Sequence, residues 1–379
     1  MTDKELDPSS SHPPLPPPPE GEQFARLRLL RSRRVGIATY KRLLAENGTA
    51  QKALAALPEV ARAAGVEDYR PCPEAVVINE LRCARALGAR LVALGDAQYP
   101  PVLAEIDDAP PFLWTLGNLA LLARPMISLV GARNASSLGT RMARLLARDL
   151  GAAGYVVVSG LARGVDAAAH LGALDTGTLA VQAGGIDVMY PAENTELAQS
   201  IAKTGLRLTE QPMGLQPMAR HFPTRNRIIS GLSRATIVIE AAAKSGSLIT
   251  ARDALDQGRD VLAVPGHPFD ARASGCNMLL RDGATLIRSA ADVIEVLGTP
   301  SAPQLPLPTP KTAPAKRGLR ETAALHLQIL ARLGPSPVAE DQLIRDLRAP
   351  AAEVAPVLVD LELEGQIARQ PGGLLSKVS

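Results

Sequence analysis

The chain has 379 residues, of which 46% are hydrophobic but only 3% aromatic, and its formal net charge is +3. This length supports about two or three domains with aliphatic cores, and the small net charge does not by itself indicate nucleic-acid binding. Three cysteines without a Cys-x-x-Cys pair or a Cys/His cluster argue against a metal site or a disulfide framework. The chain has neither a signal-peptide core nor an apolar run of about 18 residues, so we expect a cytoplasmic protein with no membrane association.

Residues 1–22 are rich in Ser and Pro and predict a disordered tail. A helical (SAM-like) module is expected over 23–105, with a turn at Val35-Gly36-Ile37 between two short helices. Such a helix pair can present backbone N–H groups to phosphates. A packing module with a solvated basic face is the interpretation we favour.

The segment 106–298 alternates short apolar runs with helical patterns. The expected strands are 126–130, 155–158, 179–183, 206–209, 236–239 and 261–264. Continuous apolar strands alternating with helices predict an α/β fold whose core is an extended Rossmann-like parallel sheet, covered on both faces. Several of these strands end in glycine, and ligands of such sheets bind at the carboxyl edge.

The C-terminal part begins with a Pro-, Thr- and Lys-rich stretch, 299–318, that reads as a linker. Residues 319–379 predict a winged-helix domain, with helices over 321–333, 338–347 and 352–364 and a hairpin over 365–376. Its third helix carries acidic residues and no Lys or Arg. We therefore favour protein contact or packing over DNA reading for this domain.

Three strand ends lead into loops suited to phosphate. The first pairs Gly131 with Arg133, and the second combines Ser159, Gly160 and Arg163. The third runs through Lys244, Ser245, Gly246 and Ser247. Glycine allows close backbone approach, and a helix start offers free N–H groups. The spacing fits neither the dinucleotide fingerprint nor a P-loop, and we expect Asp166 to act as a helix cap.

The segment 221–233 places an aromatic ring beside basic residues in a chain with only four Phe. Its candidate binding residues are Arg220, Phe222, Arg225, Asn226 and Arg227. A ring can stack on a base while guanidinium groups take phosphate oxygens. The alternative is a core helix with a basic edge. Together with three phosphate-type loops, the segment predicts a track for single-stranded nucleic acid.

No catalytic signature emerges from the sequence. The five histidines are scattered, His170 is expected in a core, and no spacing pairs a nucleophile with a base. We predict no catalytic residue, no metal and no cofactor.

Several blocks, taken together, resemble the DNA-processing protein A family, also called Smf. They are 131–133, 159–166, 190–194, 222–233, 245–251 and 264–266, in matching order and spacing, and cover most of 125–285. The resemblance implies a core that binds single-stranded DNA without hydrolysing it, dimerises, and loads the RecA recombinase during natural transformation. Ala132 and Thr209 stand where this family more often has Ser.

The resemblance also implies residue roles. Arg133 would contact phosphate and Phe222 would stack on a base. Arg225 and Arg227 would line the groove, unless one of them is a structural ion-pair partner. Ser245, Gly246 and Ser247 would donate N–H groups.

The second hypothesis is a nucleotide-processing enzyme of the phosphoribohydrolase-like Rossmann class. Glu240 would then be its catalytic acid. The PGGxGTxxE signature of that class is absent from this sequence, which favours the first hypothesis.

Overall fold

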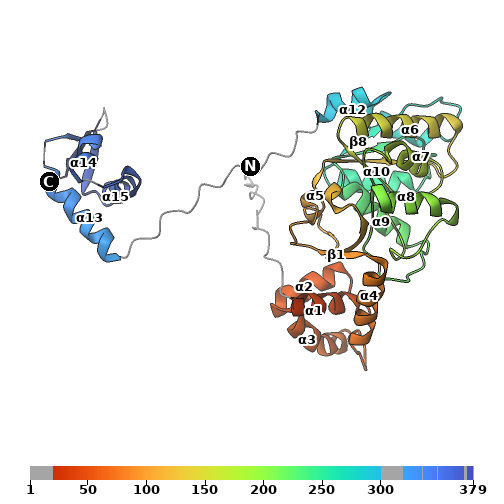
Figure 1. Ribbon diagram of the computed structural model, residues 1–379, viewed down its shortest axis with the longest axis horizontal. Helices are drawn as coiled ribbons and strands as arrows, with labels where there is room; N and C mark the ends of the chain where they lie inside the picture. Colours follow the sequence, from red (N-terminus) through yellow and green to blue (C-terminus); the bar gives the residue numbers. More distant parts are fainter. Residues whose placement is uncertain (1–19, 300–318, 335, 348, 371–373, 379) are drawn as a thin grey trace, which may run out of the picture. The chain divides into compact units, whose positions relative to one another are not determined.

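The computed structural model describes residues 20–299, 319–334, 336–347, 349–370 and 374–378. They fall into two compact units, Met1–Pro303 and Gln304–Ser379, drawn in Figure 1. The predicted tail lies outside the described residues up to position 19, and the predicted linker does so from position 300.

Four helices open the first unit: α1 (Glu20–Arg31), α2 (Ile37–Asn47), α3 (Ala50–Ala63) and α4 (Glu74–Leu87). The first three enclose an aliphatic core that includes Leu29, Leu43 and Leu57. The Glu80 carboxylate of α4 accepts hydrogen bonds from Arg31 and from the indole N–H of Trp114 in the sheet. The helical module is therefore bonded to the sheet through a buried acid.

One nine-stranded sheet forms the centre of this unit, in the order β1-β2-β6-β5-β4-β3-β7-β8-β9. The seven strands from β6 to β9 in this order are parallel to one another. At the β6 end, β2 and then β1 extend the sheet as antiparallel strands. The strands are β1 (Arg90–Ala93), β2 (Phe112–Gly117), β3 (Met126–Val130), β4 (Val156–Ser159), β5 (Thr178–Val181), β6 (Leu206–Thr209), β7 (Ala235–Val238), β8 (Asp260–Ala263) and β9 (Thr285–Leu286). The predicted mostly parallel sheet is confirmed, and it begins at β1, before the predicted domain boundary at 105.

Helices cover both faces of the sheet. Along β4, Val156 and Val158 pack in one apolar cluster with α9 and α10, whereas Val157 packs in another with α6 and α7. Burial of alternate residues on opposite faces explains why these strands read as continuous apolar runs. The helices are α5 (Pro101–Ala104), α6 (Ser137–Ala152), α7 (Val165–Ala173), α8 (Thr195–Thr204), α9 (His221–Gly231), α10 (Ser247–Asp256), α11 (Ser274–Arg281) and α12 (Ala290–Leu297), with short 3-10 turns η1 (Leu119–Ala123) and η2 (Ala192–Asn194).

The described residues of the second unit form three helices and a three-stranded sheet, which is the winged-helix arrangement that the sequence predicted. Its elements are α13 (Leu319–Arg332), β10 (Val338–Ala339), α14 (Glu340–Leu347), α15 (Ala351–Leu363), β11 (Ile367–Gln370) and β12 (Leu374–Lys377). The helix predicted over 338–347 starts two residues later, because Val338 and Ala339 pair with β12 instead. On α15, Asp360 and Glu362 are exposed.

His170 on α7 is a core residue, as its apolar surroundings predicted. Its side chain is fully buried, and Nδ1 lies 2.7 Å from the Thr178 hydroxyl. Because that hydroxyl donates to the carbonyl of Val157, the imidazole must donate through Nδ1, which leaves Nε2 buried without a partner among the described residues. Burial lowers the pKa of His170 to about 3, with Arg225 as a second cause.

This histidine makes stability depend on pH. Below its unfolded pKa the unfolded chain binds a proton that the folded chain does not, so stability is lost as the pH falls from about 6.5 toward 3. Between about pH 7 and pH 5 the loss from this group is about 2 kcal/mol, at 1.36 kcal/mol per pKa unit. Denaturant unfolding at both pH values should show this loss in the wild type and a flatter dependence in His170→Gln. If both proteins lost the same free energy of unfolding between the two pH values, the assignment of this loss to His170 would be contradicted.

Candidate functional site

A groove runs along the carboxyl edge of the sheet, where the loops after β3, β4, β5 and β7 meet. It consists of two adjoining cavities of about 350 and 640 Å³ that share Arg133, Ala162 and Phe222. We call these two cavities together the edge groove. Among the predicted site residues, those that line it are Gly131, Arg133, Gly160, Arg163, Phe222, Arg225, Asn226, Lys244, Ser245, Gly246 and Ser247.

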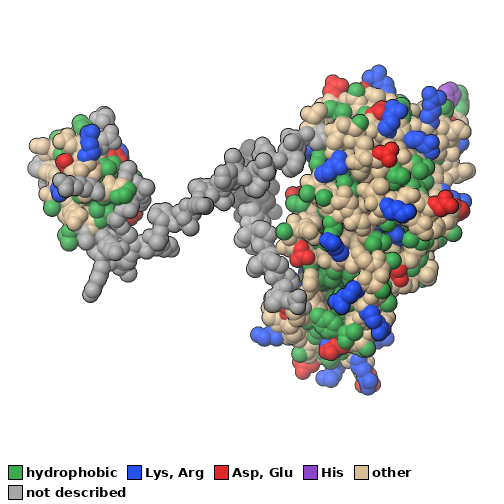
Figure 2. Space-filling model, in the orientation of Figure 1, with side chains coloured by type: hydrophobic (Ala, Val, Ile, Leu, Met, Phe, Trp, Pro, Cys, Tyr) green, Lys and Arg blue, Asp and Glu red, His purple; other side chains and the backbone are tan. Residues whose placement is uncertain are grey.

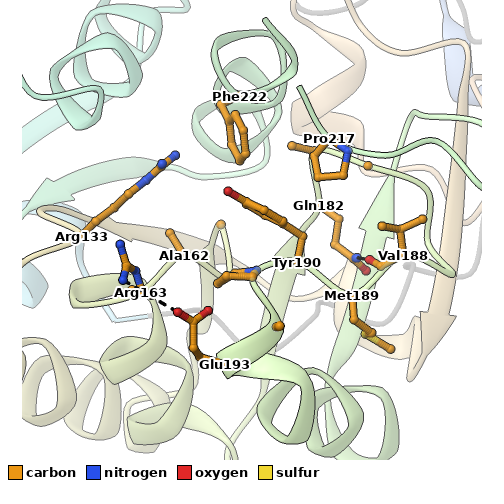
Figure 3. Close-up of a pocket in the computed structure, with 15 residues that line it drawn as sticks. Arg133, Ala162, Arg163, Gln182, Val188, Met189, Tyr190, Glu193, Pro217 and Phe222 are labelled. Carbon is orange, nitrogen blue, oxygen red and sulfur yellow. Dashed lines mark hydrogen bonds and ion pairs between the residues drawn. The ribbon is translucent and has the colours of Figure 1, made fainter. Parts of the chain in front are cut away.

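Two rings and a guanidinium meet where the cavities join. Phe222, in the first turn of α9, lies 5.7 Å from the ring of Tyr190 at an interplanar angle of 52°. The Arg133 guanidinium carbon lies 4.8 Å from the centre of the Phe222 ring, and Figure 3 shows these three side chains pointing toward one another. Such an arrangement provides an aromatic surface for a base and a cation for the adjoining phosphate.

Other exposed cations surround the groove. Arg163 faces Glu193 at 3.8 Å with both side chains more than 60% exposed, a contact worth little in water. Lys244 is exposed, and Arg272 bonds Asp270 and Glu240. Lys and Arg are also interspersed with Asp and Glu over the face drawn in Figure 2. The groove is therefore lined by four cations, Arg133, Arg163, Lys244 and Arg272, of which Arg163 and Arg272 are paired with carboxylates.

The loop before α10 is exposed at Gly246, but neighbouring N–H groups of the helix start already have acceptors. α10 begins at Ser247 without a side-chain cap, and the hydroxyls of Ser245 and Ser247 bond each other at 2.7 Å. Gly246 is exposed, and an added Cβ there would meet nothing within 4 Å. The N–H groups of Ser247, Leu248 and Ile249 already bond acceptors in residues 245 and 246. Binding of an anion at this helix start therefore stays a prediction, and it depends on the exposed backbone at Gly246.

The other two phosphate-type loops are filled by carboxylates of the chain itself. Asp166, in the first turn of α7, accepts bonds from the backbone N–H groups of Gly160 and Ala162 in the preceding loop. The prediction that it caps the helix was wrong, because the N-cap position is Gly164 and no side chain bonds the helix start there. Glu240 accepts the backbone N–H and the hydroxyl of Ser136, the residue that caps α6. Internal acids therefore already bond N–H groups in two of the three loops that the sequence suggested for phosphate.

Arg225 forms part of the floor of the groove and is 95% buried. Its Nη1 donates to the carbonyls of Gly160 and Val181 at 2.5 and 2.6 Å. Burial lowers the pKa of Arg225 to about 10, and the negative charge of Asp166 opposes this shift. Burial also raises the pKa of Asp166, which Arg225 counteracts. A side chain at position 160 would collide with this guanidinium, so the glycine there makes room for it.

Three predicted site residues do not line the groove. Arg227 points from α9 to the opposite side, where it bonds Glu210 and pairs with Asp108 at 3.2 Å. Ser159 is fully buried and donates to the carbonyl of Leu129. Arg220 is exposed just before α9 but does not border either cavity. The sequence hypothesis that one of the two arginines is an ion-pair partner therefore fits Arg227.

Several groove residues were not among the predicted ones. Tyr190 faces Phe222, and Gln182 and Met189 line the smaller cavity. Arg272 reaches the larger cavity from the loop after β8. Tyr190 could have been found, because aromatic residues are scarce and it lies in one of the family-like blocks. No local pattern singles out Arg272.

The acids of this region serve structural contacts. Glu240, the candidate acid of the enzyme hypothesis, is 93% buried and already binds Ser136 and Arg272. Within the described residues, no three His, Cys, Asp or Glu side chains come together in a way that could hold a metal ion. Those residues also include no helix long and apolar enough to cross a membrane.

Comparisons with known proteins match all three parts of the chain. The family described as DNA recombination-mediator protein A matches residues 90–298, the DprA-like N-terminal HHH domain matches 20–83, and the DprA winged helix domain matches 313–373. DNA processing protein DprA of Streptococcus pneumoniae is 46% identical over 201 residues, which cover 52% of this chain and 71% of that protein. Protein Smf of Escherichia coli is 37% identical over 283 residues, which cover 73% of this chain and 74% of that protein.

Two solved structures are similar in fold. The X-ray structure of DNA processing protein A from Streptococcus pneumoniae matches with a TM-score of 0.62 at 35% identity, covering 72% of this chain and 97% of that one. A structure of DNA processing protein A from Helicobacter pylori, described for its single-stranded DNA binding mode, matches with a TM-score of 0.51 at 30% identity. That match covers 55% of this chain and 95% of the other.

Proposed function

Because the chain belongs to the DNA recombination-mediator protein A family, we propose that it binds single-stranded DNA in the edge groove and acts as a recombination mediator. The meeting of Phe222, Tyr190 and Arg133 carries this proposal. Unpaired bases expose faces that can stack on such rings, whereas bases inside a duplex are already stacked on each other. The single-stranded DNA binding described for the Helicobacter pylori protein supports the same ligand.

Each part of the groove has a role in the proposal. A base stacks against Phe222 and Tyr190 in the smaller cavity. Arg133, Arg163 and Lys244 neutralise successive phosphates, and the exposed backbone at Gly246, before α10, receives one phosphate. Arg225 supports the floor beneath them and holds the loops after β4 and β5 together.

The proposal extends to partners of the DNA complex. The protein self-associates through its core and delivers bound single strands to the RecA recombinase, so that incoming DNA is protected and recombined during natural transformation. The end strand β9 supports self-association, since both of its residues are exposed and the end of a sheet presents unpaired backbone groups.

The proposed action requires no catalytic step. Asp166 and Glu240 are engaged in bonds that shape the groove loops. A nucleotide-processing activity would need one of these acids to be free for the substrate. Release of free base from a nucleoside monophosphate, abolished by Glu240→Gln, would contradict this part of the proposal.

Replacing Arg133 by alanine tests the groove directly. We expect the affinity for single-stranded oligonucleotides to fall roughly tenfold, because hydrogen bonds to charged groups are worth about 1.5–3 kcal/mol. The slope of log affinity against log salt should decrease by about 0.7, the value for one phosphate contact on a single strand. Fluorescence anisotropy at about 50 and 200 mM salt, with single-stranded and duplex probes, measures both quantities.

Arg234→Ala provides the matched control. Arg234 is exposed and precedes β7, at the edge of the sheet opposite the groove. Its loss should leave affinity and salt slope nearly unchanged. If both substitutions weakened binding equally, only diffuse positive charge would be involved, and a preference for duplex DNA would exclude the proposed single-strand track.

A further inference from the structure

The loop between β8 and α11 carries an aromatic side chain that the fold leaves in solvent. Phe269 is 95% exposed, the highest value among the exposed large hydrophobic residues of the described chain. Full burial of such a side chain is worth about 1.5–3 kcal/mol. The fold gains almost none of this stabilisation from Phe269.

Hydrogen bonds within the loop hold this exposed position. Asn277 bonds both backbone polar groups of Gly266, and Asp270 accepts from the backbone and the guanidinium of Arg272. The Phe269 N–H donates to the ring of His267, whose centre lies 5.6 Å from the phenyl ring. The loop therefore presents two rings in a fixed arrangement, which lowers the entropic cost of binding a partner.

The same loop is continuous with the edge groove. Arg272, three residues after Phe269, lines the larger cavity. At the end of the loop, Ser274 accepts the N–H of Ala243 and Gly275 donates to Ala241, so this segment packs against the loop that carries Lys244. The strands before both loops, β7 and β8, are parallel neighbours. The two loops therefore leave the same edge of the sheet.

We propose that Phe269, flanked by His267, is an outer stacking platform for a nucleobase of single-stranded DNA that continues past the larger cavity. Phe269 adds an exposed aromatic face three residues before Arg272, which lines the larger cavity and pairs with Asp270 and Glu240. Phe222 and Arg133 bind a base and a phosphate inside the groove, and Phe269 stacks a further base beyond it. This inference rests on the proposed function, and it adds a second contact point that lengthens the DNA site.

Binding to oligothymidylates of increasing length tests the inference. With strands of about 4 to 16 nucleotides, the range of single-strand site sizes, wild type should gain affinity as the strand becomes long enough to reach Phe269. Phe269→Ala should match wild type on the shortest strands that bind and be roughly 5- to 150-fold weaker on the longest, the fold-change equivalent of one stacked base. Phe269→Trp should bind like wild type, with indole fluorescence quenched by the longer strands only.

Two further variants separate stacking from general apolar contact. Phe269→Leu keeps an apolar side chain without an aromatic face and should behave like Phe269→Ala. Leu255→Ala removes another exposed apolar side chain, from the end of α10 that lies away from the groove, and should leave binding unchanged at every length.

The outcomes distinguish the inference from the proposed function. If wild type binds and Phe269→Ala matches it at every length, the outer platform is absent while the proposed function stands. The same conclusion follows if Phe269→Ala reduces self-association in sedimentation and leaves DNA affinity intact, because Phe269 would then face a second copy of the chain. If wild type binds no single strand at any length, both are excluded.

Discussion

Replacing Arg225 by methionine should lower the free energy of unfolding by about 3–6 kcal/mol, because two buried hydrogen bonds from a charged group, worth about 1.5–3 kcal/mol each, are lost. The guanidinium satisfies the carbonyls of Gly160 and Val181 and opposes the charge of the buried Asp166. Methionine fills similar space but donates no hydrogen bond. Two carbonyls would lose a donor, and the carboxylate would lose the nearby positive charge.

Chemical denaturation at neutral pH measures this loss, with Thr224→Ala as the control. Thr224 is exposed on the same helix, so its substitution should change stability by no more than about 0.5 kcal/mol. Arg225→Lys should recover only part of the loss, because the shorter lysine side chain does not place its ammonium where Nη1 lies between the two carbonyls.

The double variant with Asp166→Asn assigns the cause. If the uncompensated Asp166 carboxylate causes most of the destabilisation, Asn in its place should restore a substantial part of the free energy of unfolding. The double-mutant cycle then gives the coupling energy between positions 166 and 225. The deficit of Arg225→Met should also shrink at acid pH. In this variant the folded-state pKa of Asp166 would be raised further. A group with a raised folded-state pKa contributes stability at low pH, and the protein loses that contribution as the pH rises through the folded-state pKa. A fully stable Arg225→Met protein that merely binds DNA poorly would instead place Arg225 among the direct DNA contacts.

The placement of Arg225 and Arg227 shows where the sequence interpretation was limited. Residues two apart on a helix lie on different faces, so both side chains could not line one groove. Choosing between them requires knowing which face of α9 meets the sheet. The structure turns Arg225 toward the loops after β4 and β5 and Arg227 toward Glu210.

The phosphate loops were predictable in position but not in occupancy. Apolar runs that end in glycine correctly located the carboxyl edge of the sheet, since strand and loop signals are local. Glu240, however, fills the loop at Ser136 from 104 positions away in the chain, and no local pattern reveals such a contact. The antiparallel strand β2 was missed for a similar reason, because its place in the sheet depends on β6, a neighbour that lies far along the chain.

The second large effect is expected at Phe222. Replacing Phe222 by alanine should weaken single-stranded DNA binding by about 1–3 kcal/mol, or roughly 5- to 150-fold, if a base stacks on its ring. The ring is half-buried at the start of α9 between Tyr190 and Arg133. Phe222→Trp should retain binding because it keeps an aromatic face. Met218→Ala, an exposed apolar change in the preceding loop, should have little effect.

The double variant of Phe222→Ala with Arg133→Ala should show the largest binding loss of all, but less than the sum of the two single losses. Residues in contact couple by about 0.5–3 kcal/mol, and at 4.8 Å the ring helps to hold the guanidinium where a phosphate would lie. The single Phe222→Ala substitution therefore already removes part of the binding free energy that Arg133 contributes. Anisotropy titrations of the four proteins at one salt concentration give this coupling, with thermal unfolding to check that each variant is folded. Strictly additive losses would mean that ring and guanidinium bind independently, and an unchanged affinity in Phe222→Ala would remove base stacking from the proposed site.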